Sequence, residues 1–169
     1  NIEMALGGLP YEIGSFEGSL FHRFVREWLE PRLWRVYRLE WSIFCPVSRV
    51  AGQIDALFQQ VAGQKTFHMI DWKRCSKVLD PDEGREFDRY GKPPLDHLPD
   101  NPCSHYFMQQ NLYTVILEKW YGIKVSSMHL VQIHQTLESY RVIPVPDYRG
   151  DALEILNAYA ASMPLSGVG

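Results

Sequence analysis

The stretch "HMIDWKRC", residues 68–75, places an aspartate and a lysine two positions apart in an otherwise apolar run. Successive side chains of a β-strand point to opposite faces of the sheet, so Asp71 and Lys73 are expected on one face and Ile70 and Trp72 on the other. A carboxylate beside an ammonium on a strand can be a surface ion pair. It can also be a metal ligand with its catalytic partner. The spacing alone favours the surface pair, because this pattern is very common, so the rest of the chain has to decide.

The segments around this stretch predict an α/β protein with a mixed sheet. Apolar and polar residues alternate over 34–44, 49–60 and 66–74, and three successive strands with short connections favour an antiparallel meander. The remaining elements are predicted helices over 15–30, 104–122 and 151–163, and predicted strands over 124–134 and 140–145. Ser15 is the expected cap of the first helix, and Pro31 follows its end.

Length and composition predict one domain, 1–169, with a core of its own: 46% of its 169 residues are hydrophobic and 13% are aromatic. No run of eighteen or more uncharged apolar residues occurs, so we expect no membrane span. The opening "NIEMALGGLP" has no charged-then-apolar signal segment and is compatible with a piece of a longer protein. Residues 76–103 are polar and rich in Pro, Gly and Asp, which predicts a long loop insertion that is functional or mobile.

Charge and cysteine content limit the possible partners. The net charge of −3 gives no general attraction to nucleic acid, so binding of a polyanion needs a local basic patch or bound cations. Cys45, Cys75 and Cys103 are widely spaced and form no CxxC pair, which suits an intracellular, reducing environment better than a disulfide framework or a zinc site.

A second carboxylate precedes the opening stretch. "GQID", residues 52–55, lies on the neighbouring predicted strand, where Asp55 should face away from Ile54 and Phe58. Burying two carboxylates close together is unfavourable, and a divalent cation between them removes that penalty. Oxygen ligands suit Mg²⁺ or Mn²⁺, and an ammonium such as that of Lys73 can position a water or stabilise charge on a phosphate. This set of groups fits hydrolysis of a phosphodiester.

Four short motifs together resemble the PD-(D/E)XK nuclease superfamily. The first two are GxxD at 52–55 and IDWK at 70–73. "QQNLY" at 109–113 is similar to the QxxxY motif of the RecB-like exonuclease branch, and "GSLFH" at 18–22 is similar to its GxxxH motif. Each motif alone is weak, but their order and spacing, on the secondary structure that each requires, favour the resemblance. It extends over about residues 18–146 and is similar to phage and large-DNA-virus nucleases.

The resemblance implies a restriction-endonuclease-like core, a central mixed β-sheet flanked by helices, with one or two Mg²⁺ or Mn²⁺ ions. The implied metal ligands are Asp55, Asp71, the backbone carbonyl of Trp72, and His22. Lys73 is the implied water-positioning or charge-stabilising residue. Asp71 stands where the superfamily more often has glutamate. The shorter side chain still reaches a metal ion, so the difference affects the geometry of the site more than the expectation of metal binding. Three scattered cysteines do not match the four that hold an iron–sulfur cluster in some relatives, so no such cluster is expected.

Substrate-binding residues follow from the same resemblance. Gln109 and Tyr113 are expected to hold the substrate strand, and Arg23 and Arg74 to contact phosphates. Further candidates for phosphate contacts are Arg26, Lys77, Arg85, Arg89 and Lys92. Glu40 is either part of a second metal site or a solvated strand residue. The 76–103 loop is either a flap that guides the DNA or an insertion with no catalytic part.

The sequence therefore predicts a metal-dependent deoxyribonuclease, an exonuclease or a single-strand-specific enzyme acting on single strands or duplex ends. One alternative is an RNA endonuclease of the cap-snatching type, and another is a non-catalytic nucleic-acid-binding module. QxxxY favours DNA, and intact Asp55, Asp71 and Lys73 favour catalysis. Some relatives form ring-shaped trimers or are fused to replication and repair domains, so a homo-oligomer or a fusion is compatible with the family.

Overall fold

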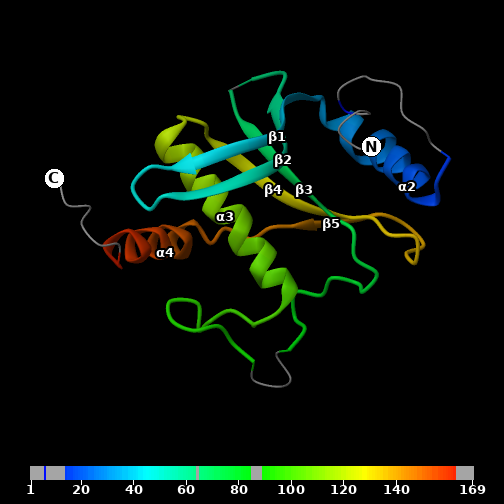
Figure 1. Ribbon diagram of the computed structural model, residues 1–169. Helices are drawn as coiled ribbons and strands as arrows, with labels where there is room; N and C mark the ends of the chain where they lie inside the picture. Colours follow the sequence, from blue (N-terminus) through cyan, green and yellow to red (C-terminus); the bar gives the residue numbers. More distant parts are fainter. Residues whose placement is uncertain (1–5, 7–13, 64, 85–88, 163–169) are drawn as a thin grey trace.

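The computed structural model describes residue 6 and residues 14–63, 65–84 and 89–162 (Figure 1). A five-stranded sheet runs in the order β1-β2-β3-β4-β5. Its strands are β1 (Trp34–Cys45), β2 (Val50–Gln60), β3 (Phe67–Lys73), β4 (Val125–Gln132) and β5 (Arg141–Pro144). The helices are α2 (Phe16–Phe24), α3 (Pro102–Trp120) and α4 (Arg149–Ser162). The predicted α/β fold with a central mixed sheet is confirmed.

Strand pairing makes the sheet mixed. β1, β2 and β3 form the predicted antiparallel meander, whereas β3 and β4 pair in parallel and β5 returns antiparallel to β4. Parallel neighbours need a long crossover connection, which the 76–101 segment and α3 provide here. This crossover brings α3 against the sheet face that carries Asp71.

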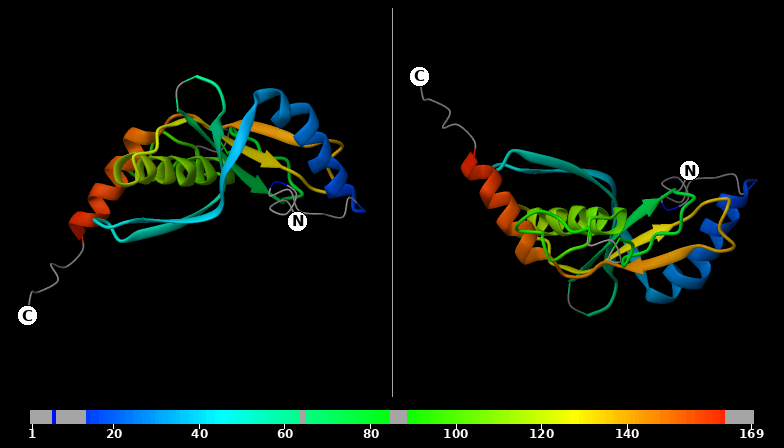
Figure 2. Two further views of the ribbon diagram at one scale, coloured as in Figure 1. Left: turned by 90° about the horizontal axis from the view of Figure 1, so that it is seen from above. Right: turned by 90° about the horizontal axis from the view of Figure 1, so that it is seen from below.

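The two faces of the sheet are covered by different helices, as Figure 2 shows from above and below. α3 and α4 enclose the larger core, which includes Leu57, Met69, Ile116, Leu130 and Leu156. α2 encloses the smaller core on the other face, which includes Phe21, Phe24, Phe58, Ile70 and Val131. None of the described helices is both long enough and apolar enough to cross a membrane.

Strand β2 does not alternate regularly, contrary to the prediction for 49–60. Ile54 and Leu57 both belong to the larger core although they are three residues apart, and Phe58 belongs to the smaller one. The break lies at Asp55, opposite Glu40 of β1, whose φ of 45° is in the left-handed region. A left-handed residue coils a two-stranded ribbon more strongly, and the β1–β2 hairpin curls away from the sheet in Figure 2. Ile54 therefore faces α3, not α2.

The predicted helix over 15–30 is also divided. Ser15 caps α2 by accepting the Gly18 N–H at 3.0 Å, as predicted, but the α-helix ends at Phe24. A π-helical turn, Val25–Leu29, and a 3-10 turn, Glu30–Arg32, follow. The wider turn lets the Trp28 ring stack on the Phe24 ring, with centroids 5.3 Å apart. Aromatic packing therefore decides where this helix stops.

Buried amides hold the described parts of the long loop. The Gln132 side chain is fully buried, and its Nε2 donates to the backbone oxygens of Cys75 at 2.9 Å and Lys77 at 2.7 Å. Its Oε1 accepts the Leu79 N–H at 3.1 Å. Asn101 caps α3 by accepting the Ser104 N–H, and its Nδ2 donates back to the loop. These hydrogen bonds fix both ends of the loop on the sheet and on α3.

Two histidines lie in an aromatic cluster on the α2 face. The His68 ring of β3 stacks parallel on Trp34 with centroids 3.8 Å apart, and its Nδ1 lies 2.8 Å from the Ser127 hydroxyl. The His129 ring of β4 meets Trp28 edge-on at 5.0 Å. Both rings are therefore packed as part of a hydrophobic surface.

Burial makes the neutral form of both rings the favourable one. Burial lowers the pKa of His68. Burial, together with the nearby charges of Arg32 and His68, lowers the pKa of His129 from 6.5 to about 4. The unfolded chain therefore binds a proton at residue 129 at a higher pH than the folded protein does.

We expect the protein to lose stability as the pH falls from about 6.5 to about 4, because unfolding then takes up a proton at His129. Replacing His129 by phenylalanine should reduce this pH-dependent loss by on the order of 1–3 kcal/mol. Urea unfolding midpoints at pH 7 and pH 4.5 measure it. The exposed His22→Phe is the control and should leave the loss unchanged. An equal loss in His129→Phe and wild type would contradict the assignment.

Candidate functional site

Two aspartates meet where β2 and β3 stop pairing. The ladder runs from Gln59↔Phe67 to Ala56↔Ile70, and the next residues on each strand are Asp55 and Asp71. Here the backbone N–H of Trp72 donates to Oδ2 of Asp55 at 2.9 Å. Because Trp72 follows Asp71 directly, this hydrogen bond brings Asp55 close to Asp71, and the charge of Asp55 raises the pKa of Asp71. The structure thus brings together the two carboxylates that the sequence singled out.

Asp71 and Lys73 form a buried ion pair, so the surface-pair interpretation is wrong. Nζ of Lys73 lies 2.5 Å from Oδ2 of Asp71, and the two side chains are only 15% and 6% exposed. The same ammonium lies 4.0 Å from the centre of the Tyr106 ring of α3. Burial raises the pKa of Asp71, the contact with Lys73 lowers it, and the charge of Asp55 raises it further. The net direction is upward because burial, the largest of these causes, outweighs the contact with Lys73.

Gln110 is a site residue that the sequence did not single out. It lies on α3, is 1% exposed, and its side-chain hydrogen bond lowers the pKa of Asp71. A signal was present: Gln110 falls on the helix face that carries Phe107, Thr114 and Leu117, all buried. A lone glutamine on an apolar stripe needs a buried partner, and Asp71 is the one it acts on, while Oε1 of Gln110 has no hydrogen-bond partner within the described residues.

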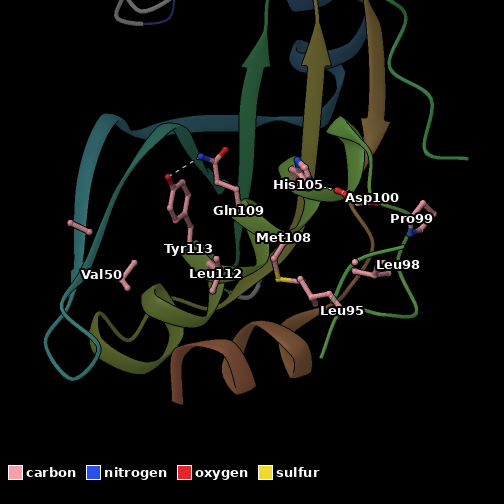
Figure 3. A pocket seen from close by; sticks show the side chains of 13 residues that line it. Val50, Leu95, Leu98, Pro99, Asp100, His105, Met108, Gln109, Leu112 and Tyr113 are labelled. Atoms are coloured by element: carbon pink, nitrogen blue, oxygen red, sulfur yellow. Dashed lines mark hydrogen bonds and ion pairs between the residues drawn. The ribbon is translucent and has the colours of Figure 1, made fainter. Parts of the chain in front are cut away.

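The GxxD and QxxxY motifs contact each other. A Cβ atom added to Gly52 would lie 2.2 Å from Cε1 of Tyr113, so the tyrosine ring rests directly on the glycine backbone. Nε2 of Gln109 donates to the Tyr113 hydroxyl at 3.2 Å, as the dashed line in Figure 3 shows. Gly52 therefore has a packing role: only a residue without a side chain leaves room for the ring.

Trp72 faces the opposite side of the sheet, as the alternation predicted. Its ring meets those of Phe21 and Phe24 edge-on, with centroids 5.6 and 5.4 Å apart, and so packs against α2. His22 of the same helix is exposed. Within the described ranges, no three His, Cys, Asp or Glu side chains gather closely enough to hold a metal ion. The ligation of a metal by His22 stays a prediction.

The remaining predicted residues that the structure describes lie at exposed positions. Glu40 lies across the β1–β2 ladder from Asp55, and its backbone oxygen accepts from Gln53. Arg74 is ion-paired with Glu17 at 2.9 Å, and Arg23 with Glu27 at 3.5 Å. Arg26 is also paired with Glu27 and Lys77 with Glu83, while Arg85 lies outside the described residues. These basic groups already have acidic partners.

The donor set fits a hard divalent cation. Asp55 and Asp71 supply carboxylate oxygens, and the carbonyl of Trp72 lies between Asp71 and Lys73 on the same strand. Burial is the largest cause of the raised pKa of Asp71, and the charge of Asp55 raises it further. Carboxylate and carbonyl oxygens are the donors that Mg²⁺ and Mn²⁺ prefer.

Comparison with known proteins adds no family. Neither a protein-family model nor a curated protein matches the chain.

The Gly52–Tyr113 contact can be tested by a double-mutant cycle. Gly52→Ala should destabilise the wild-type background by about 1–3 kcal/mol, because the added methyl group overlaps the Tyr113 ring. In a Tyr113→Ala background the same change should be nearly neutral, since the ring is gone. Denaturant unfolding of the four proteins gives the coupling energy. A cost of Gly52→Ala that is the same in both backgrounds would show that the ring is not the obstacle.

Divalent cations should stabilise the folded protein through the two carboxylates. At a concentration of Mn²⁺ about 100 times its dissociation constant, binding adds about 2.7 kcal/mol, enough to raise the thermal midpoint by several degrees. Asp55→Asn and Asp71→Asn should each remove this shift, while the exposed Asp96→Asn should retain it. Thermal unfolding in Mn²⁺ and in EDTA measures it. An undiminished shift in Asp71→Asn would place the ion elsewhere.

Proposed function

We propose that this protein is a metal-dependent nuclease that hydrolyses phosphodiester bonds in DNA, of the RecB-like kind that its motifs resemble. The buried Asp71–Lys73 ion pair beside the half-buried Asp55 carries the proposal. Burial and the nearby charge of Asp55 both disfavour the ionised form of Asp71, so this arrangement does not by itself stabilise the fold. Binding of a divalent cation explains the arrangement. A cation and an ammonium side by side can both stabilise the negative charge that develops when a phosphodiester is hydrolysed.

Each residue has a role in this proposal. Asp55, Asp71 and the carbonyl of Trp72 would hold Mg²⁺ or Mn²⁺, which when bound polarises a phosphoryl oxygen and lowers the pKa of a coordinated water. Lys73 would orient the attacking water or neutralise charge that develops on the phosphate. Asp71 and the Tyr106 ring restrict where its ammonium can lie, so little reorganisation is needed during the reaction. Gln110 holds the Asp71 carboxylate in position from α3.

Gln109 and Tyr113 are proposed to contact the substrate strand. They lie on α3 beside the residue that reaches Asp71, and their mutual hydrogen bond keeps both polar groups together. Their QxxxY spacing favours DNA over RNA as the substrate. Arg23 and Arg74 would contribute phosphate contacts after exchanging their glutamate partners, which exposed ion pairs allow at small cost.

The test compares wild-type protein with Lys73→Ala on end-labelled linear single- and double-stranded DNA, a covalently closed circle and RNA. Each substrate is incubated with Mg²⁺, Mn²⁺ or EDTA. We expect metal-dependent degradation of linear DNA, with a rate about 10²–10³-fold lower in Lys73→Ala because a preorganised charge is lost.

Lys119→Ala is the matched control, because Lys119 is an exposed lysine of α3 that contributes nothing to the proposed site. It should cut DNA like the wild type. Cleavage of the circle would indicate an endonuclease, and cleavage of RNA alone would favour the cap-snatching type of enzyme. If the protein binds DNA but cuts no substrate with any metal, the nuclease proposal is wrong and the protein is a nucleic-acid-binding module.

A further inference from the structure

A pocket of about 430 Å³ lies beside the proposed catalytic residues, between α3, the start of β2 and the loop residues 91–100 (Figure 3). Most of its wall is apolar. The hairpin contributes Val50, the loop contributes Leu95 and Leu98, and the helix contributes Met108 and Leu112. In Figure 3 the loop side chains and the hairpin side chain face each other across the helix. The volume is in the range of sites for small organic ligands.

The polar groups of this pocket favour a neutral ligand over a phosphate. Gln109 and Tyr113 line it and present amide and hydroxyl groups that both donate and accept hydrogen bonds. Among the residues that line the pocket Asp100 is acidic, and its Oδ1 atom lies 2.8 Å from Nε2 of His105. A carboxylate at the rim repels a phosphate. A flat, uncharged ring with hydrogen-bonding edges fits both the apolar walls and these polar groups.

The pocket and the proposed active site lie on the same two elements, α3 and β2. Gln109 of the wall precedes Gln110, whose side chain lowers the pKa of Asp71. Ala51 of the wall lies four residues before Asp55 on β2, about 13 Å along a strand. A DNA strand whose phosphate lies at the two aspartates can therefore place a base from one or two nucleotides away in the pocket.

We propose that this pocket binds one unpaired nucleobase of the strand that is cut, an inference that rests on the proposed nuclease function. A base inside a duplex is paired and stacked and has to leave the stack to enter the pocket. The preferred substrate is therefore single-stranded DNA or a duplex end with an unpaired overhang. Apolar and aromatic walls bind bases with little dependence on sequence, so no strong base preference is expected.

An abasic scan tests the pocket without relying on catalysis. A fluorescein-labelled single-stranded 12-mer carries one abasic residue at each position in turn, and binding is read by fluorescence anisotropy in EDTA, where a metal-dependent nuclease does not cut. Wild-type protein should bind about 10-fold more weakly when the residue that fills the pocket lacks its base. Leu112→Trp, which fills the pocket from α3, should bind the intact strand at that weaker level and show no dependence on the abasic position.

Leu95→Trp fills the pocket from the opposite wall and repeats the test if Leu112→Trp folds poorly. Val61→Trp, at an exposed position in the β2–β3 turn, is the control and should behave like wild type. Uniform binding of all abasic strands by the wild type, a position effect that persists in both pocket variants, or no binding of the intact strand would overturn the proposal. Cleavage of the intact strand in Mn²⁺, measured in parallel, tells whether the nuclease function stands independently.

Discussion

The hydrogen bond from the Trp72 N–H to the Asp55 carboxylate is the contact on which the candidate site depends. It joins β2 to β3 just beyond their last ladder pair, Ala56↔Ile70. If the ladder continued, the Trp72 N–H would donate to a backbone carbonyl of β2 instead. The side chain thus continues the sheet and is fixed against the backbone of residues 71–73. With that backbone fixed, the strand period directs Asp71 and Lys73 to α3 and Trp72 to α2. The hydrogen bond therefore fixes Asp55 next to the backbone of Asp71 and Trp72. The strand period then decides which side chains face α3 and which face α2.

Local patterns in the sequence were enough to predict the elements and the two faces of β3. The alternation around Asp71 needs only the strand period, and Trp72 and Lys73 lie on opposite faces as that period requires. The meander follows from short connections, which leave antiparallel pairing as the accessible arrangement. The motif spacing also predicted correctly that Asp55 lies near Asp71, because neighbouring strands of a hairpin keep their register.

Contacts between distant segments were not predictable in this way. The parallel pairing of β3 with β4 and the loop held by Gln132 join residues 50 to 60 positions apart, and no local pattern specifies such a partner. The helix period distinguishes Gln110, on the apolar stripe of α3, from Gln109, but it does not say which buried group Gln110 meets, because that depends on where β3 lies beneath the helix. The break in β2 depends on the left-handed Glu40, a conformation that glutamate rarely adopts and that its own sequence does not signal.

The position of α2 limits how His22 can take part in the proposed chemistry. Phe21 and Phe24 pack on Trp72, and Glu17 is ion-paired with Arg74, so α2 is attached to the strand that carries Asp71 and Lys73. His22 lies between the two phenylalanines in sequence but is exposed, so joining the aspartates requires a shift or rotation of the helix. Aromatic contacts of this kind contribute about 0.5–1.5 kcal/mol each, and an exposed ion pair contributes about 0–1 kcal/mol. The larger constraint is burial: Phe21 and Phe24 also belong to the core that α2 forms with Phe58, Ile70 and Val131, so moving the helix would expose apolar surface. Asp55 and Asp71 need no such movement, because the strands that carry them are already neighbours in the sheet.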